Sequence, residues 1–294
     1  MNQLINYFSN VPDSHRIIIL GASMLILWNI ENIIGLNFNY HKWKHALTNA
    51  FFMVFDAPVQ FIMGIAFVFA TTWVSSHNFG LLNWLHINNT WATLILTFVI
   101  LDFFEYVYHV LMHKFKKLWM FHLVHHSDRV IDVSSTLREH PGETTIRLTF
   151  LVLWVFISGA AFWAILFRQF IQIISNVFAH ANFRIPKRID RIVSLVFVTP
   201  NFHHVHHHFQ QPYTDSNYGD VLSIWDRMFG TYMTLDAEAT IFGVDTYMDE
   251  HENANFKNLM LMPFGEYRPS DKKEVVFDKT SEYEKQPNER ELVY

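Results

Sequence analysis

The chain has 294 residues, of which 51% are hydrophobic and only 17% are charged, and its formal net charge is −5. Ordinary globular domains are about a quarter charged, so this composition indicates a membrane protein with a sizeable polar part. The negative charge and the lack of a basic stripe exclude a nucleic-acid partner. The absence of cysteine excludes disulfides and cysteine-based zinc sites, so any metal must be held by histidine, carboxylate, amide or water.

Three apolar segments in the first part of the chain are long enough to cross a bilayer, which takes about 20 helical residues. They cover residues 17–36, 50–74 and 91–111. The third ends in Asp102, Glu105 and His109, which are costly in lipid, so we expect them to face the protein interior. No cleavable signal peptide is expected, because the first fifteen residues are polar and no small-residue cleavage site follows.

A fourth apolar stretch, from Ile146 to about Phe178, is too long for a single span. Ser158-Gly159 offers a turn, which predicts a helical hairpin that dips into the membrane and returns. The predicted fold class is therefore all-α: a membrane bundle of three spans plus a hairpin, with a histidine-rich metal-binding cap. Residues 1–270 are predicted to form one membrane-embedded domain, and the charged segment 271–294 a disordered tail.

Two stretches are unusually rich in histidine. Residues 109–126 read HVLMHKFKKLWMFHLVHH, and residues 203–208 read HHVHHH. Neutral imidazole is the commonest protein ligand for transition metals. Side chains three and four residues apart share one face of a helix. This rule groups the histidines into three sets: His109 with His113; His122 with His125 and His126; and His203 with His206 and His207.

The first two sets can meet only if the chain bends between them. His113 and His122 are nine residues apart, and at about 100° per residue they fall on opposite faces of a continuous helix. The bend is predicted at residues 114–117, KFKK. The same cations also suit a helix that leaves the membrane among lipid headgroups.

The placement of Lys and Arg predicts the orientation in the membrane. The predicted loop 37–50 and the regions 112–147 and 182–191 carry cations, whereas residues 1–15 and 75–90 carry none. Because cationic loops stay in the cytoplasm, the rule puts the N-terminus outside and every histidine set on the cytoplasmic side.

The chain resembles the fatty acid hydroxylase / sterol desaturase superfamily of membrane di-iron oxygenases over about residues 100–232. The stretches that carry the resemblance, in the order of the superfamily, are HVLMH, HLVHH, STLREHPGE, TPNFHHVHH and NYGDVLSIWDRMFGTY. It implies two iron ions bound by histidines on the cytoplasmic face. It also implies O2-dependent hydroxylation or desaturation of a C–H bond in a lipid (fatty acyl, glyceryl ether or sterol), with the bilayer and a separate electron-donor protein as partners.

Carried over position by position, the resemblance implies nine iron ligands: His109, His113, His122, His125, His126, His180, His203, His206 and His207. Some members have an HxxxH motif where this chain has Asn176 and His180. It therefore stays open whether Asn176 or Asn182 completes the shell of one metal.

Further residues are candidates for holding the ligands in place. Glu105 lies one turn before His109, and Asp226 follows the second histidine stretch, so either carboxylate could orient an imidazole through its other ring nitrogen. His204 falls on the face opposite the second stretch's ligands, which suits an outer or solvent-facing position. His140 precedes a proline and is a further candidate, mainly structural. The pair at 41 and 45 also reads HxxxH, but cations and a tryptophan between the two histidines indicate an interfacial anchor.

Two other functions fit parts of the pattern. A zinc-dependent membrane hydrolase would use an activated water and a general base, although the chain has no HExxH motif. Zinc has no redox chemistry but can replace iron in a recombinant sample. A metal-binding or transport protein is the second alternative, and transport predicts ligands at the bilayer midplane instead of at one face.

Overall fold

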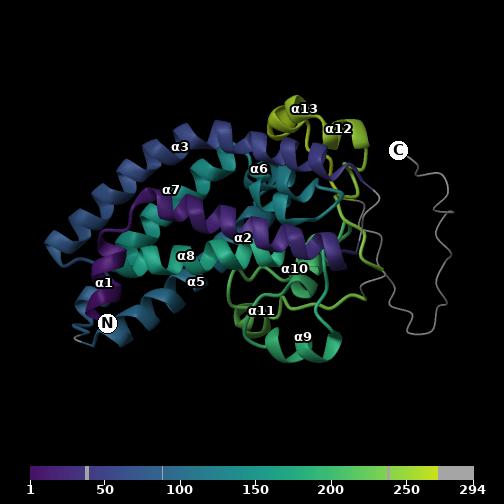
Figure 1. Cartoon of the computed structure of the whole chain (residues 1–294). Helices are drawn as coiled ribbons and strands as arrows, with labels where there is room; N and C mark the ends of the chain where they lie inside the picture. Colours follow the sequence, from purple (N-terminus) through teal and green to yellow (C-terminus); the bar gives the residue numbers. More distant parts are fainter. Residues whose placement is uncertain (37–39, 88, 237–238, 271–294) are drawn as a thin grey trace.

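The computed structural model describes residues 1–36, 40–87, 89–236 and 239–270, and the elements of this part of the chain are helical (Figure 1). The segments are α1 Asn2–Ser9, α2 Asp13–Ile34, α3 Lys42–His77, α4 Leu81–Trp84, α5 Thr90–Lys114, α6 Lys116–His126, η1 Val133–Leu137, α7 Pro141–Ser158, α8 Phe162–Ala179, α9 Lys187–Val193, α10 Pro200–His206, α11 Ile224–Phe229, α12 Glu250–Ala254, α13 Phe256–Leu261 and η3 Met262–Phe264. The predicted tail, 271–294, lies outside the described residues, so its disorder and the extent of a single domain stay predictions.

Four helices are long and apolar enough to cross a membrane: α2, α3 with α4, α5 and α8. The first three match the predicted spans, although α2 ends at Ile34, two residues before the predicted end, and α8 is the second arm of the predicted hairpin. Helix α3 begins at Lys42, so residues 42–50 are helical. The predicted loop over residues 37–50 is therefore wrong for that part. Its 36 residues would extend about 54 Å at 1.5 Å per residue, so the helix reaches well beyond the hydrocarbon core.

The predicted turn between the hairpin arms is confirmed. Helix α7 ends at Ser158, and Gly159 follows with a φ of 66°, a left-handed conformation that glycine adopts without steric cost. A Cβ at Gly159 would lie 2.6 Å from the carbonyl oxygen of Phe79, so close packing also requires glycine there. The helix α8 then runs back along the bundle and returns the chain to the histidine-rich end (Figure 1).

The polar side chains of the spans face inward, as predicted. Asp102 is fully buried and Glu105 is 8% exposed. Both lie near the guanidinium of Arg168 on α8, at 3.6 Å and 3.8 Å, and Arg168 also bonds Asp220 at 2.6 Å. A buried charge is tolerated when it is paired in this way, and these pairs connect α5, α8 and the 216–223 loop.

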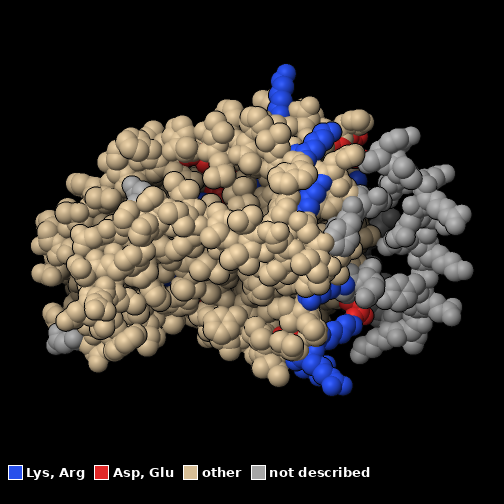
Figure 2. Space-filling model, in the orientation of Figure 1, with Lys and Arg blue, Asp and Glu red and all other residues tan. Residues whose placement is uncertain are grey.

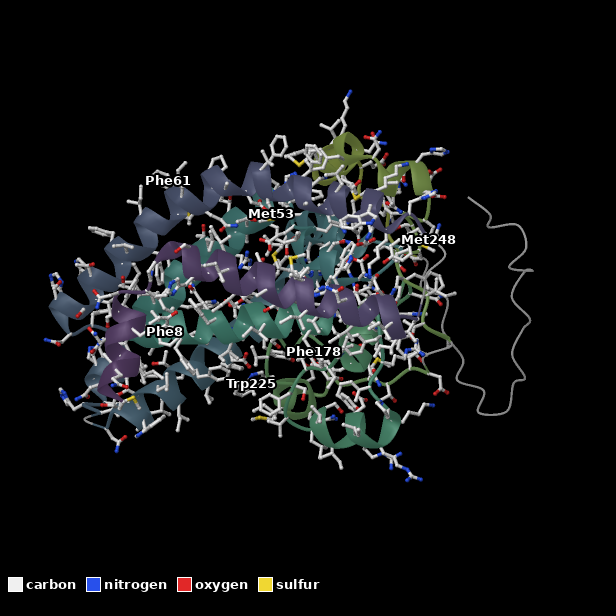
Figure 3. The ribbon with its side chains drawn as sticks, viewed as in Figure 1. Phe8, Met53, Phe61, Phe178, Trp225 and Met248 are labelled. Carbon is white, nitrogen blue, oxygen red and sulfur yellow. The ribbon has the colours of Figure 1, made fainter. Side chains whose placement is uncertain are left out.

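The outer surface of the bundle is apolar, as a lipid-facing surface must be. Phe61, for example, points outward from α3 and is 72% exposed (Figure 3). On the face drawn in Figure 2, Lys and Arg form a band towards one end of the molecule. The short helices α6 and α10 to α13 gather at that end (Figure 1) and form the predicted cap.

Candidate metal centre

The predicted bend brings the first two histidine sets together. Helix α5 ends at Lys114, α6 begins at Lys116, and Phe115 between them has an extended backbone. The two helices therefore pack against each other instead of continuing in line. His109 Nε2 comes within 3.1 Å of His122 Nε2.

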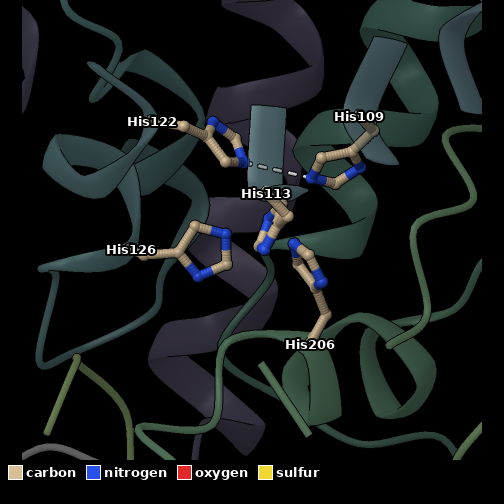
Figure 4. Close-up of side chains that lie close together, drawn as sticks. All are labelled: His109, His113, His122, His126 and His206. Atoms are coloured by element: carbon tan, nitrogen blue, oxygen red, sulfur yellow. Dashed lines mark hydrogen bonds between the residues drawn. The ribbon is translucent and has the colours of Figure 1, made fainter. Parts of the chain in front are cut away.

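Nine histidines form two compact clusters, within each of which the potential ligand atoms lie within 4.8 Å of one another. The five-histidine cluster consists of His109, His113, His122, His126 and His206, whose rings face a common centre (Figure 4). The four-histidine cluster consists of His125, His180, His203 and His207. All nine predicted ligands are thus present, and their role as ligands stays a prediction.

The histidine sets do not correspond to the clusters one to one. The helix α6 sends His122 and His126 to the five-histidine cluster but His125 to the other. The second histidine stretch divides in the same way, with His206 in the first cluster and His203 in the second. Each triple predicted to share a helix face therefore bridges two sites, because its face is wide enough to reach both.

His180 reaches the four-histidine cluster as its place in the chain predicted. It follows the last residue of α8, and its Nε2 lies 3.1 Å from the Nε2 atoms of both His125 and His203. The returning arm of the hairpin therefore supplies a member that lies outside both histidine-rich stretches.

Backbone carbonyl groups hold four of the rings. Each of these imidazoles donates its Nδ1–H to a carbonyl oxygen, which leaves Nε2 free to face the cluster. The bonds are His109 to Tyr218 at 2.9 Å, His206 to Ser216 at 2.7 Å, His125 to Arg138 at 3.2 Å and His180 to Asn176 at 2.8 Å. The backbone carbonyl of Asn176 thus orients the ring of His180, and the side chain of Asn176 is a member of neither cluster.

Two carboxylates hold two further rings, and the sequence analysis missed both. Glu143 Oε1 lies 2.6 Å from Nδ1 of His122, and both side chains are buried. Asp215 Oδ1 lies 3.3 Å from Nδ1 of His113. Glu143 stands in the quoted stretch STLREHPGE, but nothing in its spacing shows that α7 carries it back to α6.

The remaining ring nitrogens indicate that a metal belongs here. Several buried nitrogens of the five-histidine cluster have no hydrogen-bond partner among the described residues: both of His126, and Nε2 of His113 and His206. Unsatisfied buried polar atoms are costly. Two imidazoles bound to one metal at about 2.1 Å and at right angles have nitrogens about 3.0 Å apart, close to the 3.1 Å seen in each cluster.

Burial keeps the cap histidines neutral, the form that binds metals. Removal from water lowers the pKa of His122 to about 3 and that of His180 to about 4. The same cause holds the pKa of five others well below the usual range: His125, His126, His203, His206 and His207. At neutral pH these rings therefore offer lone pairs without first losing a proton.

The predicted carboxylate partners were wrong. Glu105 pairs with Arg168, and the Nδ1 of His109 that it was predicted to hold bonds the carbonyl of Tyr218 instead. Asp226 accepts the backbone N–H groups of Tyr218 and Gly219, at 2.7 Å and 2.8 Å. Asp226 therefore supports the loop that contains Tyr218, whose carbonyl accepts the hydrogen bond from His109. It acts on His109 through this loop and not by direct contact with the ring, as had been predicted.

Three other residues predicted to hold the cluster histidines in place make contacts elsewhere in the fold. His140 caps α7 by accepting the N–H of Gly142, and its other ring nitrogen bonds the carbonyl of Met260. The backbone N–H of Asn182 donates to Glu31 at 2.6 Å. His204 is buried against Phe242 and belongs to neither cluster, so its predicted solvent-facing position is wrong.

His45 corrects the interpretation of the 41–45 pair. His41 is exposed, but His45 lies with Nε2 2.8 Å from Asp128 and Nδ1 3.1 Å from Asp132. Both nitrogens can donate only in the protonated ring, so a cation lies between two buried carboxylates. Tyr40 adds a hydroxyl bond to Asp132 at 2.6 Å. His45 thus forms an internal ion pair with these two aspartates, and the pair fixes the chain that follows α6. His45 is not an interfacial anchor.

Helices long and apolar enough for a bilayer, with two buried histidine clusters able to hold metal at one end, are the features of a histidine-box membrane protein. Comparison with known proteins refines this class. Residues 94–231 match the family described as fatty acid hydroxylase. This segment contains all nine cluster histidines, so the match to the fatty acid hydroxylase family covers the whole candidate metal centre.

Characterised relatives are similar over the same part of the chain. The ornithine lipid hydroxylase OlsE of Rhizobium tropici is 30% identical over 138 residues, which are 47% of this chain and 41% of that protein. Alkylglycerol monooxygenase of Danio rerio is 31% identical over 160 residues, 51% of this chain and 32% of that protein. The human alkylglycerol monooxygenase is 29% identical over 165 residues, 53% and 33% respectively.

The chain spans less than half the length of these curated relatives. No solved structure matches it significantly.

Proposed function

We propose that this protein is a membrane di-iron monooxygenase that hydroxylates a C–H bond of a lipid. The observation that carries the proposal is the pair of buried histidine clusters inside a fatty acid hydroxylase segment. The five-histidine cluster would hold one iron and the four-histidine cluster the other. Bound iron supplies the redox chemistry that activates O2, which zinc cannot supply.

The protein's own residues would position and shield this chemistry. Glu143, Asp215 and the four backbone carbonyls orient the imidazoles. Burial of the clusters keeps bulk water away from a reactive site. The overall reaction consumes a C–H bond, O2, two electrons and two protons, and it yields an alcohol and water. We infer that a separate donor protein supplies the electrons on the cytoplasmic side.

The names of the relatives favour hydroxylation over desaturation. One acts on ornithine lipid and another on alkylglycerols, and both are named as enzymes that insert oxygen. A lipid with a long alkyl or acyl chain is therefore the proposed substrate class. Such a substrate would reach the capped end of the bundle from the bilayer.

Labelled dioxygen tests the proposal. The purified protein, loaded with iron and supplied with reductant and total membrane lipid, should transfer ¹⁸O from ¹⁸O2 into a lipid hydroxyl group, detected by mass spectrometry. A zinc-dependent hydrolase would instead take its oxygen from H2¹⁸O and would work without air. Product formation at the full rate under strict anaerobiosis would exclude the monooxygenase.

A further inference from the structure

A short helix beside the bundle is amphipathic and has no buried residue. In α9, Lys187, Arg188 and Arg191 occupy one side, and Ile189 and Ile192 the other, since successive residues turn by about 100°. The two isoleucines are 53% and 70% exposed. The apolar surface continues beyond α9 at three exposed side chains: Leu195, Val196 and Phe197.

A second segment repeats this character elsewhere in the chain. The last residue of α13, Leu261, is 55% exposed, and Phe264 in η3 is 71% exposed. Lys257 on α13 is exposed as well. Large apolar side chains together with cations are typical of segments that lie in the plane of a membrane surface.

The two segments lie at one level of the molecule. Figure 1 shows α9 and α13 on opposite sides of the bundle, at about the same position along its long axis. The band of Lys and Arg in Figure 2 crosses the molecule at this end. Two segments from distant parts of the sequence thus lie in one plane. A flat membrane surface explains this arrangement better than a small ligand does.

We propose that α9 with residues 194–197 and α13 with η3 form a collar that lies at the headgroup–acyl boundary of the bilayer. Arg188 and Arg191 are exposed and form no ion pair with a described residue, so they are available to anionic lipid headgroups. The cations would bind the headgroups, and the apolar faces would enter the upper part of the acyl layer.

The collar also fixes the height of the metal centre above the lipid. Asn201, at the start of α10, bonds both the N–H and the carbonyl of Ile185 just before α9, at 3.0 Å and 2.8 Å. Since α10 carries His203 and His206, the cluster histidines move with the collar. This inference rests on the candidate spans and not on the proposed reaction.

Spin labels can test the collar directly because the chain has no cysteine, so each single-cysteine variant carries one label. Labels would be placed at Ile192→Cys and Leu261→Cys in nanodiscs. Phe61→Cys on α3 serves as the lipid control and Glu250→Cys on α12 as the aqueous control. Collision rates with O2, which partitions into lipid, and with a water-soluble nickel complex would be measured by electron paramagnetic resonance.

Both collar labels should collide with O2 several-fold more often than the Glu250 label does, and with nickel several-fold less often. Nickel collisions equal to those of Glu250→Cys would overturn the proposal. Exclusion of both reagents with spin–spin broadening would also overturn it, since that result indicates a second copy on this surface.

The lipid charge gives an independent measurement. Adding anionic lipid to a zwitterionic nanodisc should move the Ile192→Cys label deeper, and Arg188→Glu with Arg191→Glu should abolish that shift. An unchanged shift in the charge-reversed variant would refute headgroup binding by these two arginines.

Discussion

Removal of the Glu143 carboxylate should weaken metal binding without dismantling the fold. In Glu143→Ala the buried Nδ1–H of His122, now 2.6 Å from a carboxylate oxygen, loses its acceptor. Leaving such a buried donor unsatisfied costs about 1–3 kcal/mol. Loss of the outer partner of a metal-bound histidine typically lowers affinity by about 10–100-fold, which corresponds to about 1.4–2.7 kcal/mol. The first cost falls on folding stability and the second on metal affinity, so the two are measured separately.

A graded series makes the test sharper. Glu143→Gln keeps an oxygen that can accept the same bond but removes the charge, so its affinity should fall between those of the parent and Glu143→Ala. Glu139→Gln is the matched control, because Glu139 pairs with Arg147 at a partly exposed site and acts on His122 through its charge alone, without a hydrogen bond to the ring. It should stay within about 1 kcal/mol of the parent.

The assay is competition for iron between the protein and a chelator of known affinity, followed by metal analysis of the protein fraction. Circular dichroism and the thermal midpoint of each variant report whether the fold is intact. The reasoning would be refuted if Glu143→Ala retained the parent affinity, or if Glu139→Gln lost as much as Glu143→Ala.

Three further changes should give distinct outcomes. His180→Ala should remove iron and abolish turnover, whereas His41→Ala, an exposed change, should leave metal content and activity as they are; the reverse result would remove His180 from the ligand set. His45→Ala should leave two buried aspartates without their cation and lower the free energy of unfolding by about 3 kcal/mol, measured by denaturant titration; unchanged stability would contradict the internal ion pair. A reporter fused after Tyr294 should behave as cytoplasmic and one inserted beside His86 as external, and the opposite pattern would refute the orientation inferred from Lys and Arg.

The histidine pattern was predictable because its signal is local. A spacing of three or four residues states which side chains share a helix face, and nine residues between His113 and His122 require a bend. The structure has that bend. The division of each triple between two clusters was not predictable, because it depends on how α6 and α10 are rotated against each other.

The partners of the histidines could not be read from spacing. Glu105 has the right spacing from His109, yet its nearest cation, Arg168, is carried by a helix that begins more than fifty residues later. His45 was misassigned for the same reason, since its two aspartates follow more than eighty residues later. Contacts across such separations follow from packing, which a local pattern does not encode.

The four carbonyl contacts have a consequence for how substitutions would affect this protein. Tyr218, Ser216, Arg138 and Asn176 hold rings through main-chain oxygen, which every amino acid possesses. Replacing these side chains one at a time would therefore leave the carbonyl contacts in place and would not reveal their importance. What such a contact cannot tolerate is a shift of the peptide plane, so an insertion, deletion or proline replacement beside any of the four carbonyls should displace the ring that it holds.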